Sequence, residues 1–121
     1  MDLSETKNLP KNDYTPAGLD GPSKLLLRAA SLIERDGWCQ NTLTSPDGRM
    51  CLIGAVHYAN VGRKIYQDAE DGVVWTDLST EAITRVDRAL KMSAHLWNDD
   101  AGRTKEEVVS KLRAVALGVL A

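Results

Sequence analysis

Apolar side chains recur every three or four residues in two long segments of the chain. Between Ser23 and Gly37, the apolar residues fall on one face of a helix and the lysine and arginine residues on the other. Glycine ends helices readily, so the first predicted helix stops before Gly37. A second amphipathic helix is predicted from Thr80 to Trp97, where the apolar stripe consists of Ile83, Val86, Leu90, Ala94 and Trp97.

Two further helices are predicted between and after these segments. Residues 50–60 are apolar on nearly every side, which is typical of a helix buried by several neighbours. Gly54 in this helix costs about 1 kcal/mol relative to alanine, unless close packing requires the missing side chain. A capping box begins the last helix, because the Thr104 hydroxyl and the Glu107 carboxylate can bond each other's backbone amides. Its buried face consists of Val108, Leu112, Val115 and Val119.

The remaining segments contain helix-breaking residues. Proline and glycine interrupt residues 1–22, which we expect to form a flexible N-terminal arm before a single helical domain over residues 23–121. The Pro46-Asp47-Gly48 turn favours a short hairpin within residues 37–50, and Val73–Thr76 favours a short strand. The sequence therefore predicts an all-α fold, a compact bundle of about four helices with an irregular N-terminal arm and at most one short hairpin.

Composition and charge do not favour nucleic acid or membrane as a partner. The chain has 121 residues, of which 43% are hydrophobic and 26% are charged, and its formal net charge is -2. This near-neutral balance gives no electrostatic reason to expect nucleic acid or an anionic membrane as a partner. No apolar run reaches the ~18 residues of a membrane span, and the N-terminus lacks the apolar segment of a secretion signal. We expect a cytoplasmic protein without membrane contact.

Cys39 and Cys51 are candidates for metal binding and for thiol chemistry. With His57 and His95 they would supply four zinc ligands, but structural zinc sites bring cysteines in close pairs, and eleven residues separate these two. We therefore predict no metal and no cofactor. A disulfide between the two cysteines is geometrically feasible but disfavoured in a reducing cytosol. The helix start at Cys51 favours a thiolate, whereas its position beside core residues favours a buried thiol.

Four short motifs follow one another along the chain: GWCQ from Gly37, CLIGA from Cys51, WND from Trp97 and TKEEV from Thr104. Together they resemble an uncharacterised family of short domains, of unknown function, from actinobacteria and their phages. The resemblance covers about residues 23–117. It implies a helical domain whose motif residues cluster in space, and it makes a phage origin an expectation. It carries no activity over to this chain.

The motif residues have a structural and a functional interpretation. Asn98 and Asp99 favour turns because their side chains bond nearby backbone, and Trp97 fits a core anchor, so turn chemistry explains most of this segment. No catalytic residue is assigned, since no activation motif surrounds either cysteine. In the functional interpretation the motif residues surround one polar pocket, whose candidate ligand-binding residues are Trp38, Cys39, Gln40, Cys51, Trp97, Asn98 and Asp99.

The helix predicted over residues 80–97 carries the remaining candidate features. Asp87 lies beside the apolar stripe, so we expect it to be half-buried and paired with an arginine or a helix N-terminus. Arg85, Arg88 and Lys91 spread over the outer face as a candidate phosphate-contacting edge. The link to the next helix is about seven residues, longer than the turn of a helix-turn-helix motif, so nucleic acid is not the expected partner.

A non-enzymatic protein-interaction or regulatory accessory module is the function that these features favour, encoded by a phage or mobile element. Another protein is the expected partner, and a homodimer is an alternative. A different class of function is a small ligand-binding or Cys-dependent enzyme domain using Cys39, Asn98 and Asp99. Binding of nucleic acid through the helix over residues 80–97 is the second alternative.

Overall fold

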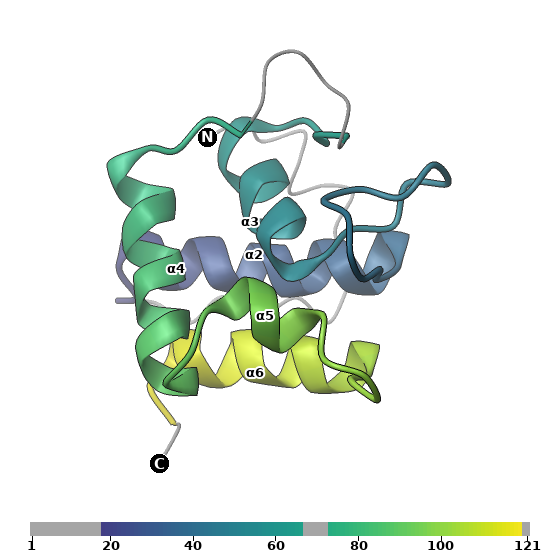
Figure 1. Ribbon diagram of the computed structural model, residues 1–121. Helices are drawn as coiled ribbons and strands as arrows, with labels where there is room; N and C mark the ends of the chain where they lie inside the picture. Colours follow the sequence, from purple (N-terminus) through teal and green to yellow (C-terminus); the bar gives the residue numbers. More distant parts are fainter. Residues whose placement is uncertain (1–17, 67–72, 120–121) are drawn as a thin grey trace.

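Five helices make up the regular structure of residues 18–66 and 73–119, the residues that the computed structural model describes (Figure 1). They are α2 (Gly21–Asp36), α3 (Leu52–Val61), α4 (Asp77–Leu90), α5 (Ala94–Asn98) and α6 (Lys105–Leu117). These ranges contain no strand, so the predicted all-α class is confirmed for them. Residues 1–17 of the predicted arm lie outside the described residues, and α2 begins at Gly21, two residues earlier than expected.

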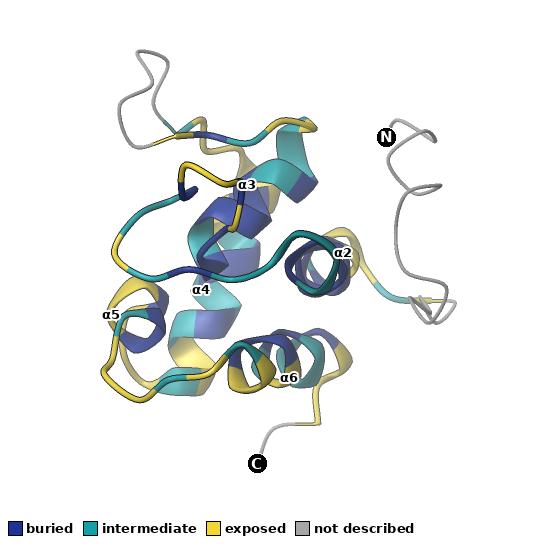
Figure 2. Cartoon of the chain, turned by 90° about the vertical axis from the view of Figure 1, so that its right-hand side faces the viewer, coloured by how far each residue is buried: buried dark blue, intermediate teal, exposed yellow. Residues whose placement is uncertain are grey.

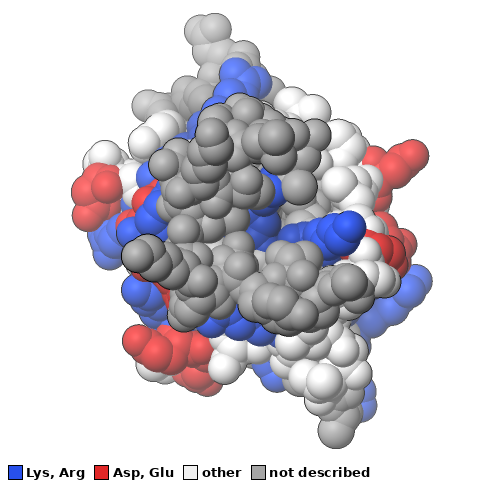
Figure 3. All heavy atoms as spheres, turned by 180° about the vertical axis from the view of Figure 1, so that it is seen from behind, with Lys and Arg blue, Asp and Glu red and all other residues white. Residues whose placement is uncertain are grey.

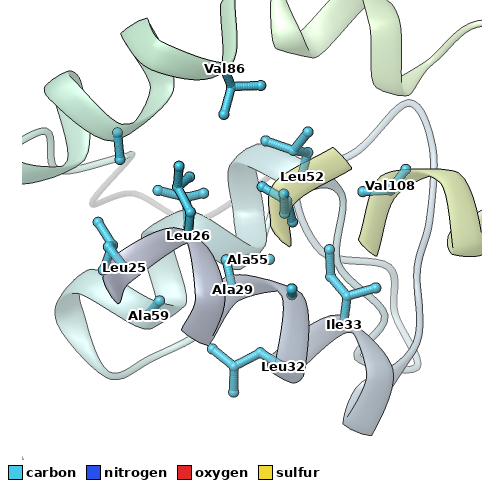
Figure 4. Close-up of a cluster of buried hydrophobic side chains, with 14 of the residues drawn as sticks. Leu25, Leu26, Ala29, Leu32, Ile33, Leu52, Ala55, Ala59, Val86 and Val108 are labelled. Atoms are coloured by element: carbon cyan, nitrogen blue, oxygen red, sulfur yellow. The ribbon is translucent and has the colours of Figure 1, made fainter. Parts of the chain in front are cut away.

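The core lies where α2 meets the other helices. α2 packs against α6, α3 and α4, and α3 also contacts α4 and α5. Seen along α2, the buried sides of α2, α3 and α6 are turned toward one another (Figure 2). Ala29 of α2 lies beside Ala55 of α3 in the close-up of the core, and both are fully buried (Figure 4). Small side chains at this contact let larger neighbours such as Leu26 and Leu52 fill the space around it.

The helix predicted over residues 80–97 is in fact two helices. α4 begins at Asp77, after a capping box between Thr76 and Ser79, and it ends at Leu90. Lys91 then has a left-handed backbone with a φ of 58°, and α5 begins at Ala94. The apolar stripe did not reveal this break, because its residues remain on the core side of both helices.

Asp87 explains how the chain can turn at this point. Its carboxylate accepts a hydrogen bond from the backbone N–H of Ala94 at 2.7 Å, the first residue of α5. The sequence left an arginine and a helix N-terminus open as partners of a half-buried Asp87, and the structure shows the helix N-terminus. The bond satisfies one of the free amides at the start of α5, so a side chain of α4 stabilises the next helix.

The expected strand did not form, and the expected hairpin is limited to one antiparallel bridge around the turn at Pro46-Asp47-Gly48. Val73–Thr76 pairs with no strand, and Thr76 instead serves as the N-cap of α4. Within residues 37–50 there are two isolated bridges, which join Met50 to Trp38 in parallel and to Thr44 in antiparallel orientation. Met50 thus lies between two extended segments that are each too short to continue a ladder.

Candidate functional site

The candidate residues meet where the segment 37–51 contacts α5. The backbone N–H of Cys39 donates to the carbonyl of Met50 at 3.1 Å, and the N–H of Met50 donates to the carbonyl of Gly37 at 3.1 Å. These two bonds form the parallel bridge between Trp38 and Met50. The bridge brings the GWCQ segment against the residues that lead into α3.

Asn98 occupies the place of the next rung of this bridge. In a continued parallel ladder, the N–H of Leu52 would donate to the carbonyl of Cys39. Instead, the Oδ1 atom of Asn98 accepts from the N–H of Leu52 at 3.0 Å, and its Nδ2 atom donates to the carbonyl of Cys39 at 3.2 Å. The side-chain amide of Asn98 therefore acts as an inserted peptide group that ties the loop to the N-terminus of α3.

The carboxamide of Asn98 makes two further hydrogen bonds. Its Oδ1 atom also accepts from the indole Nε1 of Trp38 at 2.7 Å, and its Nδ2 atom also donates to Oδ1 of Asp99 at 3.0 Å. A carboxamide oxygen has two lone pairs and its nitrogen carries two protons, so Asn98 uses its full bonding capacity. The side chain that makes these bonds is fully buried, with 1% of Asn98 exposed.

Gln40 and Asp99 extend these contacts toward the surface. The Nε2 atom of Gln40 donates to the backbone carbonyls of Asn98 at 3.0 Å and Asp100 at 2.9 Å. Asp99 accepts from the N–H of Asn41 at 2.9 Å, and Asn41 has a left-handed φ of 67°. Loop 37–51 and the end of α5 are thus fastened by hydrogen bonds between the candidate residues, which direct their polar groups at one another.

The two cysteines are buried free thiols. The thiol of Cys39 lies within hydrogen-bond distance of the carbonyls of Arg49 (3.3 Å) and Thr42 (3.5 Å), and burial raises its pKa. The Sγ atom of Cys51 accepts from the N–H of Gly54 at 3.3 Å and so caps α3. Burial raises the pKa of Cys51 to about 11, so it outweighs the stabilising effect of the helix N-terminus on a thiolate.

Trp97 lies apart from this hydrogen-bonded contact. Its ring is covered by the guanidinium of Arg103 at 4.0 Å, and Arg103 also donates to the carbonyl of Trp97 and pairs with Glu107. Sequence reasoning missed Arg103, although its position four residues before Glu107 is a signal for such a pair. A shallow groove beside the stacked ring is lined by Trp97, Arg103, Glu107, Ser110, Lys111 and Ala114.

One residue of the candidate phosphate-contacting edge on α4, Arg85, is paired with carboxylates. Arg85 donates to both carboxylate oxygens of Asp20, at 2.9 and 2.7 Å, and also pairs with Glu81 at 3.2 Å. These bonds hold the pKa of Asp20 well below its usual range, so the pair remains charged at neutral pH. On the face opposite to that of Figure 1, cationic and acidic side chains are interspersed in the described part of the surface (Figure 3).

Neither a metal cluster nor a membrane span is formed by the parts of the chain that the structure describes. No group of three or more His, Cys, Asp or Glu residues is placed there to hold a metal ion. Of the two histidines considered as zinc ligands, His95 is exposed and His57 is buried. Among the described helices, none is long and apolar enough to cross a membrane.

His57 should make the stability of the protein depend on pH. It is 3% exposed, neither ring nitrogen has a hydrogen-bond partner, and burial, aided by the charge of Arg63, lowers its pKa from 6.5. The unfolded chain therefore binds more protons than the folded chain below pH 6.5, so the free energy of unfolding must fall as the pH falls. We expect His57→Leu to flatten this fall between pH 7 and 5 in urea unfolding.

Exposed His95 provides the control for this measurement. His95→Gln removes a histidine whose side chain is 67% exposed, so it compares the loss of an exposed imidazole with the loss of the buried one. An equally steep fall in His57→Leu and in the unmodified chain would show that other groups control the pH dependence.

Comparison with known proteins yields a family match over most of the chain. The model of a family described as "Family of unknown function (DUF6197)" matches residues 19–117. No curated protein and no solved structure matches the chain. The matched range extends from the residues before α2 to the end of α6, and it includes all the candidate residues described above.

Proposed function

We propose that this chain, which belongs to the family of unknown function DUF6197, is a non-enzymatic module that binds another protein. The observation that carries the proposal is that the side-chain amide of Asn98 already makes all the hydrogen bonds it can, donating two and accepting two. An amide in this state has no bond left for a substrate. The thiols of Cys39 and Cys51 are buried and their pKa values are raised, which disfavours either of them as a catalytic nucleophile at neutral pH.

A surface for a partner is available at the start of α4. Val74, Trp75 and Leu78 are 44%, 48% and 38% exposed, and we call these three residues the Trp75 surface. Aromatic residues are enriched at protein interfaces, and truncation of a central tryptophan is among the changes that weaken binding most. The paired state of Arg85 supports a protein rather than nucleic acid as the partner.

The proposal predicts that Trp75→Ser weakens the complex with the partner by about tenfold or more, since hot-spot truncations cost about 2 kcal/mol or more. The partner would be recovered with tagged protein from the cells that encode the chain, identified by native mass spectrometry and titrated by calorimetry. The matched control is Leu96→Ser, a change of another exposed apolar residue, on α5, of which 58% is exposed.

Two results would contradict the proposal. One is an unchanged affinity in Trp75→Ser. The other is a catalytic activity of the purified chain that Cys39→Ser or Asp99→Ala abolishes without unfolding the protein, which would establish the enzyme alternative.

The location and origin of the protein belong to the same proposal. We propose a cytoplasmic accessory module of an actinobacterial phage or mobile element, which the motif resemblance supports.

A further inference from the structure

The parallel bridge places Cys39 and Cys51 next to each other. Trp38 pairs with Met50, so the residues that follow them, Cys39 and Cys51, are neighbours in the same register. Cys51 keeps an extended backbone, with a φ of -79° and a ψ of 175°. Side chains alternate between the two faces of extended segments, so both cysteine side chains leave the bridge on the face opposite to Trp38 and Met50.

This register suits a disulfide. At the bridge the two backbones are about 4.8 Å apart, within the range of about 4.4–6.8 Å between the Cα atoms of disulfide-linked residues. Beyond Cys39 and Cys51 the amide of Asn98 separates the two segments. Both thiols are free and buried, with 6% of each residue exposed.

Oxidation would break the thiol contacts of Cys39 with the carbonyls of Thr42 and Arg49 but leave the backbone bridge in place. The bond that Cys39 gives to the carbonyl of Arg49 can be lost without leaving that carbonyl unpaired, because the N–H of Ser45 also donates to it at 2.7 Å. The Sγ atom of Cys51 accepts from Gly54, and a disulfide sulfur retains lone pairs for this contact. The bridge itself uses only backbone atoms, so a bond between the side chains leaves it intact.

We propose that Cys39 and Cys51 are a redox site, which a peroxide converts reversibly into an internal disulfide that locks loop 37–51 to the start of α3. One thiolate attacks the O–O bond of hydrogen peroxide and becomes a sulfenic acid, with release of water. The second thiol then displaces the hydroxyl group as a second water and forms the S–S bond. Two thiols thus lose two electrons and two protons, and one peroxide is reduced to two waters.

The raised pKa values set the rate of this reaction. The thiolate is the reacting form, and both groups are largely protonated at neutral pH because they are buried. The reaction should therefore be slow at pH 7 and faster as the pH rises. The loop closed by the bond is short, and closing it removes freedom from the unfolded chain, so the oxidised protein should unfold at a higher temperature.

The test uses the full reduced chain, incubated in its folded state with hydrogen peroxide. Intact mass spectrometry after denaturation and alkylation should show the loss of two hydrogen atoms and no alkylated cysteine, and dithiothreitol should reverse both. Peptide mapping should find Cys39 linked to Cys51. The midpoint of thermal unfolding should rise by more than about 5 °C on oxidation.

Cys39→Ser and Cys51→Ser are the controls, and neither should lose the two hydrogen atoms or gain thermal stability. Cys51→Ser should still fold, since serine is a favoured N-cap residue and can replace the sulfur that caps α3. Addition of oxygen atoms without a disulfide would overturn the proposal. So would a disulfide formed only between molecules, or one formed only when the chain is oxidised in denaturant.

Discussion

Asn98→Ala is expected to lower the free energy of unfolding by more than about 3 kcal/mol, since each buried polar group left without a partner costs about 1–3 kcal/mol. The change deletes four hydrogen bonds. It leaves the N–H of Leu52, the carbonyl of Cys39 and the indole N–H of Trp38 without that partner. Because native domains are stable by only about 5–15 kcal/mol, this loss would remove a large share of the free energy of unfolding. Urea unfolding followed by circular dichroism measures it.

Asn60→Ala is the matched control for this change. The Asn60 amide makes one exposed hydrogen bond, to the Oγ1 atom of Thr76 at 3.1 Å, so its removal should cost less than about 1 kcal/mol. Similar unfolding midpoints for the two alanine variants would show that Asn98 does not replace a backbone rung. A second comparison is Asn98→Asp, which keeps an acceptor for Leu52 but loses the donor to Cys39 and places another carboxylate beside Asp99.

The same measurement separates the two interpretations of the WND segment. A residue that serves only a ligand can be changed at little cost to folding, whereas a residue that joins two parts of the scaffold cannot. A large loss of stability in Asn98→Ala would therefore support the structural interpretation, which assigns recognition to the surface. A variant that stays stable would instead support Asn98 as a ligand-binding residue, and with it the alternative of a ligand-binding or Cys-dependent enzyme domain.

Local signals in the sequence located several helix ends. Gly37 follows the last residue of α2, as expected of a glycine at that position, and the capping box of Thr104 and Glu107 begins α6. In each case a few adjacent residues determine the backbone. The break between α4 and α5 escaped prediction because the bond from Ala94 to Asp87 that stabilises it leaves the apolar pattern unchanged.

The candidate site was predicted as a cluster but not in its geometry. Asn98 contacts Trp38 and Leu52, which lie about 60 and 46 residues away in sequence. Which donors and acceptors meet there depends on how α5 and loop 37–51 pack, and no local pattern encodes that. The state of Cys51 shows the same difficulty, because its position at a helix start is local whereas the burial that raises its pKa depends on the whole fold.

Gly54→Ala is expected to lower the free energy of unfolding by at least about 2 kcal/mol, although alanine favours a helix by about 1 kcal/mol over glycine. A Cβ atom on Gly54 would lie 2.1 Å from the carbonyl oxygen of Leu43, a distance that no packed structure tolerates. Leu43 cannot move away freely, because the same oxygen accepts from the N–H of Cys51 at 3.1 Å. The alternative that the sequence left open, that close packing requires this glycine, agrees with this contact.

Gly62→Ala, at the other end of α3, makes the test decisive. Gly62 has a left-handed φ of 82° and no atom within 4 Å of its Cβ position, so alanine should cost only the backbone strain of about 1–2 kcal/mol. Backbone preference alone would stabilise Gly54→Ala and destabilise Gly62→Ala. The contact with Leu43 predicts the larger loss at Gly54, measured as the difference in urea unfolding free energy. A smaller loss at Gly54 than at Gly62 would show that loop 37–51 can move away from α3, and the rigid junction inferred around Asn98 would then be wrong.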